Sequence, residues 1–181
     1  ATAQKFVDQG KIRYLGLSNE TPYGLSKYLH LSSTNKFPRV VSVQNPYSLI
    51  NRTYEVGMAE ISVRDQVGLL AYSPLAFGML SGKYLNGQMP EGSRLKLYGK
   101  NFPRYQGTRS QLAVEEYYKI AQKYEISLTQ MSLAFVNMQP FVDSNIIGAT
   151  NMKQLEENID SVHIDLSDEI IKEINLIHEN N

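Results

Sequence analysis

The sequence predicts an α/β fold built on a parallel sheet, and two observations support this prediction. Segments with the short apolar pattern of strands alternate with segments that have the apolar period of helices along most of the 181 residues. The stretch from Val67 to Ala71 is apolar or glycine throughout, as expected for a strand that is covered on both faces. The composition, 42% hydrophobic and 20% charged, is ordinary for a globular protein. We therefore expect one domain that spans residues 1–181.

The charge balance excludes several classes of partner. Lys plus Arg and Asp plus Glu number 18 each, so no net field favours nucleic acid or an anionic membrane. Any phosphate group must then be bound by local side chains and backbone amides. Cysteine is absent, which excludes disulfides, thiol catalysis and cysteine metal sites. No apolar run approaches the roughly 18 residues that a membrane span needs, and we expect a cytoplasmic protein without membrane partners.

The expected elements follow from local start and stop signals. Gly10 can end the first helix in a left-handed cap, Asn19 or Thr21 can cap the second, and Pro22 suits the first turn of that second helix. Ser127 and Gln130 form a capping box for a later helix. In chain order we expect a helix at 1–9, a strand at 12–17, a helix from 21 to about 31, a strand at 39–44, a helix at 54–63, a strand at 67–72, helices at 111–124 and 127–138, a strand at 144–147, and helices at 151–159 and 167–178.

A long connection separates the third strand from the helices that follow. Residues 78–110 carry six glycines and two prolines together with many basic and aromatic residues. This length is far beyond the usual connection of about 4–6 residues. Such a segment is either functional or mobile, and the sequence leaves both alternatives open.

The strand count selects among parallel folds. Alternating units imply right-handed crossovers, but only four strands are recognisable, whereas a closed (β/α) barrel needs eight and about 250 residues. An open doubly wound sheet would accommodate four units, yet no glycine-rich dinucleotide fingerprint follows any strand. The sequence therefore favours half of a (β/α)8 barrel.

The third strand ends in the layout of a binding site. Tyr72 falls at its carboxyl end, where barrels bind their ligands, and a loop with hydroxyls, glycines and Lys83 follows it. An aromatic face, hydroxyl groups and a cation together suit a nucleotide. The alternative is that Tyr72 only caps the core, which is the commoner role of an aromatic at a strand end.

Four ordered motifs resemble the aldo-keto reductases, and the resemblance covers Gly10 to His178. The motifs are GKIRYLGLSN at 10–19, VQNPYSLINR at 43–52, YSPLAFGMLSGKY at 72–84 and IIGATNMKQLEEN at 146–158. The chain is most similar to the Tas-like bacterial branch of that family, near the β subunits of potassium channels. The resemblance implies a (β/α)8 barrel that binds NADP(H) at the carboxyl ends of its strands, and this chain is similar to its carboxyl-terminal half.

The resemblance also implies roles for individual residues. Tyr72 is similar to the aromatic that stacks on the nicotinamide, and the other matches divide among the carboxamide, the pyrophosphate, the adenosine phosphates and the adenine. The carboxamide matches are Ser18, Asn19 and Gln44, the pyrophosphate matches are Ser73, Pro74, Leu75, Ala76 and Gly78, and the cations for the adenosine phosphates are Lys83 and Arg94. The turn at Gly148 and Thr150 is matched to the 2′-phosphate, and Gln154, Glu157 and Asn158 to that phosphate and the adenine. The alternative roles are helix capping for Ser18 and Asn19 and solvated surface charges for Lys83 and Arg94.

No catalytic or metal-binding residues are expected in this chain. The resemblance implies an Asp, Tyr, Lys and His group that reduces a small carbonyl substrate, but its counterparts are not found before Gly10. His30, His163 and His178 are expected on helices or after them, where they are not placed to replace that group. We therefore expect a parent protein that reduces aldehydes or ketones with NADPH, while this chain alone is inactive.

Two other interpretations of the sequence remain open. One is a non-catalytic module that senses NADP(H) or binds another protein, and the other is a different barrel fragment that binds phosphate at the same edge. A half-barrel exposes strand edges, so we also expect the chain to pair with its missing amino-terminal half or with copies of itself.

Overall fold

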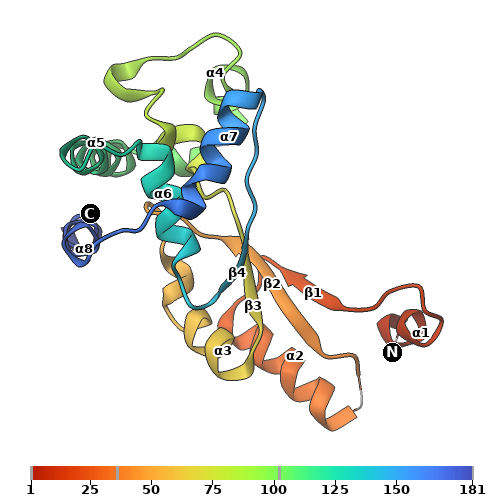
Figure 1. Cartoon of the computed structure of the whole chain (residues 1–181). Helices are drawn as coiled ribbons and strands as arrows, with labels where there is room; N and C mark the ends of the chain where they lie inside the picture. Colours follow the sequence, from red (N-terminus) through yellow and green to blue (C-terminus); the bar gives the residue numbers. More distant parts are fainter. Residues whose placement is uncertain (1, 36, 102, 181) are drawn as a thin grey trace.

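The computed structural model describes residues 2–35, 37–101 and 103–180. Its centre is a four-stranded sheet in which every neighbouring pair is parallel (Figure 1). The strands are β1 (Leu15–Ser18), β2 (Val40–Pro46), β3 (Gly68–Tyr72) and β4 (Val142–Asn145), and their spatial order is β1-β2-β3-β4. Each strand thus lies beside the one before it in the chain, which is the order in a barrel. A doubly wound sheet would contain a reversal of strand order, so that alternative is wrong.

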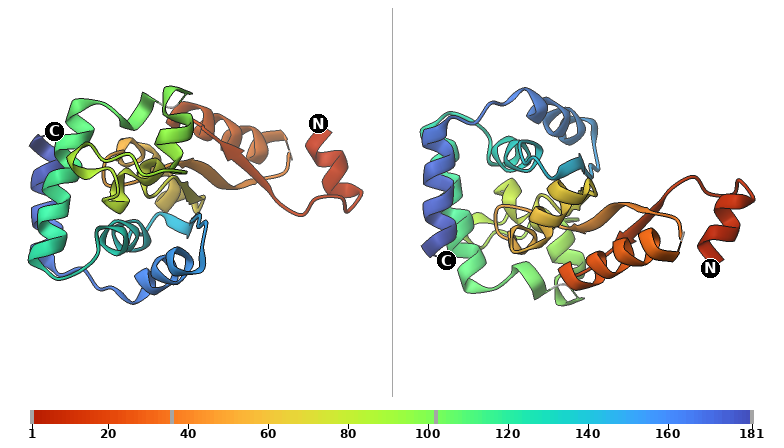
Figure 2. Two further views of the ribbon diagram at one scale, coloured as in Figure 1. Left: turned by 90° about the horizontal axis from the view of Figure 1, so that it is seen from above. Right: turned by 90° about the horizontal axis from the view of Figure 1, so that it is seen from below.

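The helices lie close to the predicted segments except α4, which falls within the segment expected to be a loop. They are α1 (Thr2–Asp8), α2 (Pro22–Asn35), α3 (Met58–Asp65), α4 (Arg94–Tyr98), α5 (Thr108–Lys123), α6 (Leu128–Asn137), α7 (Met152–Asp160) and α8 (Asp168–Asn180). The views of Figure 2 show α5 and α8 side by side and α1 set apart from the sheet. No helix in the described ranges is long and apolar enough to cross a membrane.

Capping explains where several helices begin and end. Thr21 Oγ1 accepts a hydrogen bond from Gly24 N at 3.1 Å, and Ser127 Oγ accepts one from Gln130 N at 3.0 Å. Gly10 follows α1 with a φ of 68°, which fits the predicted left-handed cap. The predicted start of the third helix at residue 54 is wrong by one turn. Gly57 interrupts the segment with a φ of 90°, so Thr53–Glu55 forms a separate 3₁₀ turn before α3.

The two faces of the sheet differ in character. Val43, Leu69 and Ala71 are fully buried on the face that packs against the helices. Because neighbouring residues in a strand point to opposite faces, Gly16 and Gly68 belong to the other face. There an ideal Cβ on Gly68 would lie 1.7 Å from Asp143 Oδ2, so any larger residue at this position would displace the Asp143 side chain. This small and polar face would line the inside of a closed barrel.

The long segment after β3 is built from short helical turns. They are 3₁₀ turns at Ala76–Ser81, Leu85–Gly87, Gly99–Asn101 and Pro103–Tyr105, together with α4. Leu95 and Tyr105 are 6% and 2% exposed, and Tyr84 Oη accepts a hydrogen bond from Leu95 N at 3.1 Å. The segment therefore packs against the core, which the glycine-rich sequence did not indicate.

Candidate cofactor site

The carboxyl ends of β1, β2 and β3 bring four of the predicted residues together. Tyr72 Oη donates a hydrogen bond to Asn19 Oδ1 at 2.6 Å. Asn19 N donates to Gln44 O at 3.0 Å, and Asn19 Nδ2 donates to Ser18 Oγ at 3.2 Å. These residues lie at one edge of the sheet, and the side chains of Ser18, Asn19 and Gln44 are exposed there. The edge thus offers an aromatic ring with amide and hydroxyl groups around it.

Asn45 holds this arrangement and was not predicted. Its Oδ1 accepts a hydrogen bond from Glu20 N at 3.0 Å, and its Nδ2 donates to Glu20 O at 2.8 Å. The side chain is 8% exposed, so the pair of bonds lies largely out of water. Asn19 directly precedes Glu20, the residue whose backbone Asn45 holds. Its φ is 54°, a conformation that asparagine tolerates better than most residues. The only sequence signal for Asn45 is its place within the motif at 43–52.

The Gly148 turn lies at the same edge of the sheet. Ile146 N donates to Ala71 O at 2.8 Å, so the chain leaves β4 beside the carboxyl end of β3. From there it enters the turn, where Asn158 Nδ2 donates to Gly148 O at 3.2 Å. The fourth motif therefore follows the strand end that neighbours Tyr72.

The side chains on α7 are already engaged within the protein. Gln154 Oε1 accepts hydrogen bonds from Thr150 N at 2.9 Å and Thr150 Oγ1 at 3.0 Å. Glu157 Oε1 accepts one from Ser127 Oγ at 2.7 Å, and Asn158 is only 4% exposed. Thr150 is exposed and Gln154 is partly exposed, whereas Asn158 is buried and holds the turn through its bond to Gly148. The sequence alone did not show which of these side chains is exposed and which is buried.

The loop after β3 contains an unusual concentration of positive φ angles. Ser73, Ala76 and Phe77 have φ values of 55°, 47° and 59°, and none of them is glycine. Such conformations cost on the order of 1–3 kcal/mol each and cluster at binding sites. The loop also uses some of its own amides, since Ala76 N donates to Ser73 O and Gly78 N donates to Leu75 O, both at 2.8 Å. Those two amides therefore contribute to the turn itself. Pro74, which belongs to the same loop, is buried.

Three cations surround this loop. The Lys83 side chain lies across Gly78, where an ideal Cβ would come within 2.8 Å of Lys83 Cε. Arg94 Cζ lies 5.8 Å from the centre of the Phe77 ring, and the Arg94 side chain is exposed. The third is Arg104, which the sequence did not single out. Its interaction with the Tyr72 hydroxyl is the largest cause that raises the pKa of Arg104 above its ordinary value.

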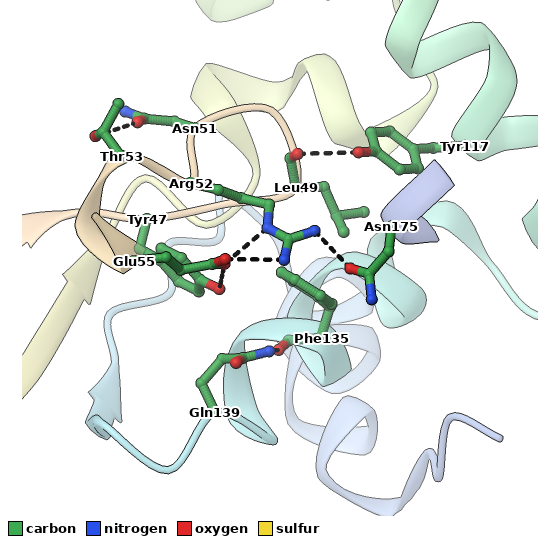
Figure 3. A network of polar contacts seen from close by, with 10 residues as sticks. All are labelled: Tyr47, Leu49, Asn51, Arg52, Thr53, Glu55, Tyr117, Phe135, Gln139 and Asn175. Atoms are coloured by element: carbon green, nitrogen blue, oxygen red, sulfur yellow. Dashed lines mark hydrogen bonds and ion pairs between the residues drawn. The ribbon is translucent and has the colours of Figure 1, made fainter. Parts of the chain in front are cut away.

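A polar network joins the loop after β2 to two helices (Figure 3). Arg52 Nε and Nη2 donate to the Glu55 carboxylate at 2.7 and 2.9 Å, and Arg52 Nη1 donates to Asn175 Oδ1 at 2.7 Å. Tyr47 Oη donates to Glu55 Oε1 at 2.5 Å, and the guanidinium lies 5.1 Å from the centre of the Phe135 ring. The network therefore connects the carboxyl edge of the sheet to α6 and α8.

The ionisation of these groups follows from that pairing. Burial, followed by the hydrogen bond to Glu55, raises the pKa of Tyr47 well above its ordinary value. Burial alone would raise the pKa of Glu55, but the hydrogen bonds from Arg52 and Tyr47 outweigh it and lower that pKa. Burial also lowers the pKa of His178, with the charge of Arg52 as a further cause. A charged Glu55 thus stays paired with Arg52 at neutral pH, which indicates a structural network.

The described residues contain no group of three or more His, Cys, Asp and Glu side chains that could hold a metal ion. His178 lies on α8, where burial and then the charge of Arg52 lower its pKa. His30 and His163 are exposed side chains on α2 and in the turn after α7.

The fold and this edge define the class of protein. The aldo/keto reductase family model matches residues 1–179, so the chain belongs to that family, whose fold is a (β/α)8 barrel. The parallel four-stranded sheet with its helices is consistent with the carboxyl-terminal half of such a barrel.

Similar proteins include reductases and one channel subunit. The chain is 52% identical over 170 residues to Protein tas of Escherichia coli, which covers 94% of this chain and 49% of that protein. It is 38% identical to an aldo-keto reductase of Babesia bovis, covering 97% and 64% of the two chains. It is 30% identical to a Schizosaccharomyces pombe protein named "Putative voltage-gated potassium channel subunit beta", covering 96% of this chain and 52% of that protein. The chain spans about half the length of Protein tas.

Proposed function

We propose that this chain carries the NADP(H) contacts of a reductase that converts aldehydes or ketones to alcohols. The observation that supports this most is the hydrogen bond from the Tyr72 hydroxyl to the Asn19 side chain at the carboxyl edge of the sheet. A flat aromatic bordered by amide groups suits a nicotinamide ring and its carboxamide. When bound, the cofactor supplies the hydride, and the protein supplies orientation.

Several of the remaining predicted residues suit the other parts of the cofactor. The strained turn at Ser73–Gly78 brings small side chains to the edge, and Lys83 and Arg94 place positive charge around it. Thr150 and Gln154 lie at the start of α7, where a phosphate is favoured by the helix dipole. These phosphate-directed groups are the reason for proposing NADP(H) over NAD(H).

Proton transfer to the carbonyl is proposed to come from residues outside this chain. The open, small and polar face of the sheet would then be covered by the rest of a barrel, supplied by a further segment of the protein or by a second copy. The small carbonyl substrate would bind between the two parts.

The proposal is tested by titrating the purified chain with NADPH and, as a matched ligand without the 2′-phosphate, with NADH. Size-exclusion chromatography beforehand defines the species that is titrated. We expect NADPH to bind about tenfold or more tightly than NADH, because hydrogen bonds to a charged group contribute about 1.5–3 kcal/mol. We expect no NADPH oxidation when an aromatic aldehyde is added. Absence of NADPH binding, with stabilisation by sugar phosphates instead, would overturn the proposal.

A second candidate is a module that senses NADP(H) or binds another protein, and the likeness to a channel β subunit favours it. NADPH binding by this chain is expected under both proposals. They separate when a longer form with a closed barrel is assayed, since a reductase oxidises NADPH with a carbonyl substrate and a sensor does not.

A further inference from the structure

The turn that follows β1 is held on both sides of Asn19 by the end of β2. On one side, Asn19 N donates to Gln44 O at 3.0 Å. On the other side, Glu20 N donates to Asn45 Oδ1 at 3.0 Å, and Glu20 O accepts from Asn45 Nδ2 at 2.8 Å. The strand register itself ends with Ser18 opposite Gln44. The Asn45 side chain therefore continues the contact between the two strands past the end of their register.

The residue between these bonds has an unfavourable backbone conformation. Asn19 has a φ of 54° and an exposed side chain. Residues other than glycine are strained in this left-handed region, which asparagine visits only occasionally. Because the peptide groups on both sides of Asn19 are hydrogen-bonded, the direction in which its side chain leaves the backbone is fixed.

That direction brings the Asn19 carboxamide to the candidate site. Its Oδ1 accepts from Tyr72 Oη at 2.6 Å, and its Nδ2 donates to Ser18 Oγ at 3.2 Å. A carboxamide has two N–H groups and two lone pairs, so one of each remains for an amide group of a ligand. Asn45 is different, because it is 8% exposed and directs both of its polar atoms at the backbone of Glu20.

We propose that Asn45 is a positioning residue, which holds Asn19 in its left-handed conformation and thereby presents the Asn19 carboxamide to the nicotinamide end of the cofactor. This rests on the proposed function, because it assigns a role within the same site. Without the two bonds from Asn45, the strained Asn19 is free to relax in the unliganded chain. Binding must then restore its conformation, and this ordering costs affinity.

The alternative role for Asn45 is to stabilise the fold alone. Two hydrogen bonds from a buried side chain contribute to stability under either role, so a melting temperature does not separate them. A positioning residue affects only the part of the ligand that meets Asn19, and only while the Asn19 side chain is present. A residue that only stabilises the fold leaves the affinity of the folded chain unchanged.

The test is a double-mutant cycle on the full chain with Asn45→Leu, Asn19→Ala and the two combined. Affinity is measured for NADPH and for adenosine 2′,5′-bisphosphate, which has the adenine end of the cofactor without its nicotinamide. Asn45→Asp is a milder variant that keeps the acceptor for Glu20 N. Ser62→Ala on α3 is the matched control, because Ser62 is 3% exposed and its Oγ shares a 2.6 Å hydrogen bond with Tyr54 Oη. Thermal unfolding verifies that each variant is folded.

We expect Asn45→Leu to weaken NADPH binding about fivefold to tenfold, because the cofactor must then order one backbone residue itself. Asn45→Asp should lose less, about twofold to fivefold, because one of the two bonds remains. Affinity for adenosine 2′,5′-bisphosphate should stay within about twofold of the parent in both variants. In the Asn19→Ala background, Asn45→Leu should change NADPH affinity by less than about twofold. Ser62→Ala should lower the melting temperature and bind both ligands like the parent chain.

A folded Asn45→Leu chain that binds NADPH as tightly as the parent would overturn the positioning role. If that variant does not fold, unchanged affinity of Asn45→Asp would do the same, and failure of both to fold would assign Asn45 to the fold alone. Equal losses for the two ligands, or an undiminished loss in the Asn19→Ala background, would also overturn the role and leave the proposed function intact. A parent chain that does not bind NADPH would instead reject the proposed function, and the positioning role with it.

Discussion

Replacing Tyr72 with alanine is expected to weaken NADPH binding by this chain about tenfold to a hundredfold. Stacking of a base on an aromatic side chain contributes about 1–3 kcal/mol by alanine substitution, and each 1.4 kcal/mol is a factor of ten. The substitution also removes the hydroxyl that donates to Asn19 Oδ1 at the edge of the sheet. The binding constant is measured by isothermal titration calorimetry.

Tyr14→Ala is the control for this substitution. Tyr14 is 76% exposed and directly precedes β1, so it lies at the opposite end of that strand from Asn19. We expect its loss to leave NADPH binding unchanged. Equal effects of Tyr72→Ala and Tyr14→Ala would contradict the assignment of Tyr72 as the stacking platform.

The second large effect concerns stability. Arg52→Met is expected to lower the free energy of unfolding by about 2–3 kcal/mol, because it leaves Glu55 partly buried without its cation. The Arg52 and Glu55 side chains are 11% and 28% exposed, so the pair is less screened than a surface ion pair. The bond from Arg52 to Asn175 is lost as well, which releases α8 from the loop after β2. Urea unfolding measures the change.

Arg64→Met provides the matched comparison for the ion pair. Arg64 pairs with Glu60 at 2.8 Å on α3, but the two side chains are 75% and 65% exposed. An exposed pair of this kind contributes about 0.3–0.5 kcal/mol. If Arg52→Met were no more destabilising than Arg64→Met, the network of Figure 3 would not stabilise the fold as inferred.

The fold was largely predictable because its determinants are local. The alternation of apolar periods gave the strands and helices, and side chains such as Thr21 and Ser127 cap helices where the sequence indicated. The errors lie at element ends and in the segment after β3, where α4 was not expected. The strand expected at 12–17 is Leu15–Ser18, and the strand expected at 144–147 is Val142–Asn145, since pairing with the neighbouring strand decides which residues join the sheet.

The site was predictable only where a motif marks it. Asn19, Gln44 and Tyr72 were expected at strand ends, and the parallel register brings those ends together. Asn45 acts through its hydrogen bonds with Glu20, which is far from it in the sequence. No local pattern encodes such contacts. The same holds for Asn158, whose burial separates its role from that of the more exposed Gln154 on the same helix.

The strained turn after β3 illustrates a further limit. Gly78 has a φ of 95°, a conformation that glycine adopts without strain. Ala76 and Phe77 also have positive φ values, although neither residue favours them. Packing of the turn at Pro103–Tyr105 against this segment holds it in place, and a window of sequence around Ala76 does not contain that information.

The central claim, that these strand ends form one pocket for a reduced pyridine nucleotide, is tested most directly by mapping NADPH-induced changes in the backbone amide NMR spectrum of the chain. The account predicts that the largest shifts fall on Asn19, Gln44, Tyr72 and Gly148, at the carboxyl ends of the four strands. Shifts confined to the opposite end of the sheet, around Tyr14 and Gln66, would contradict it.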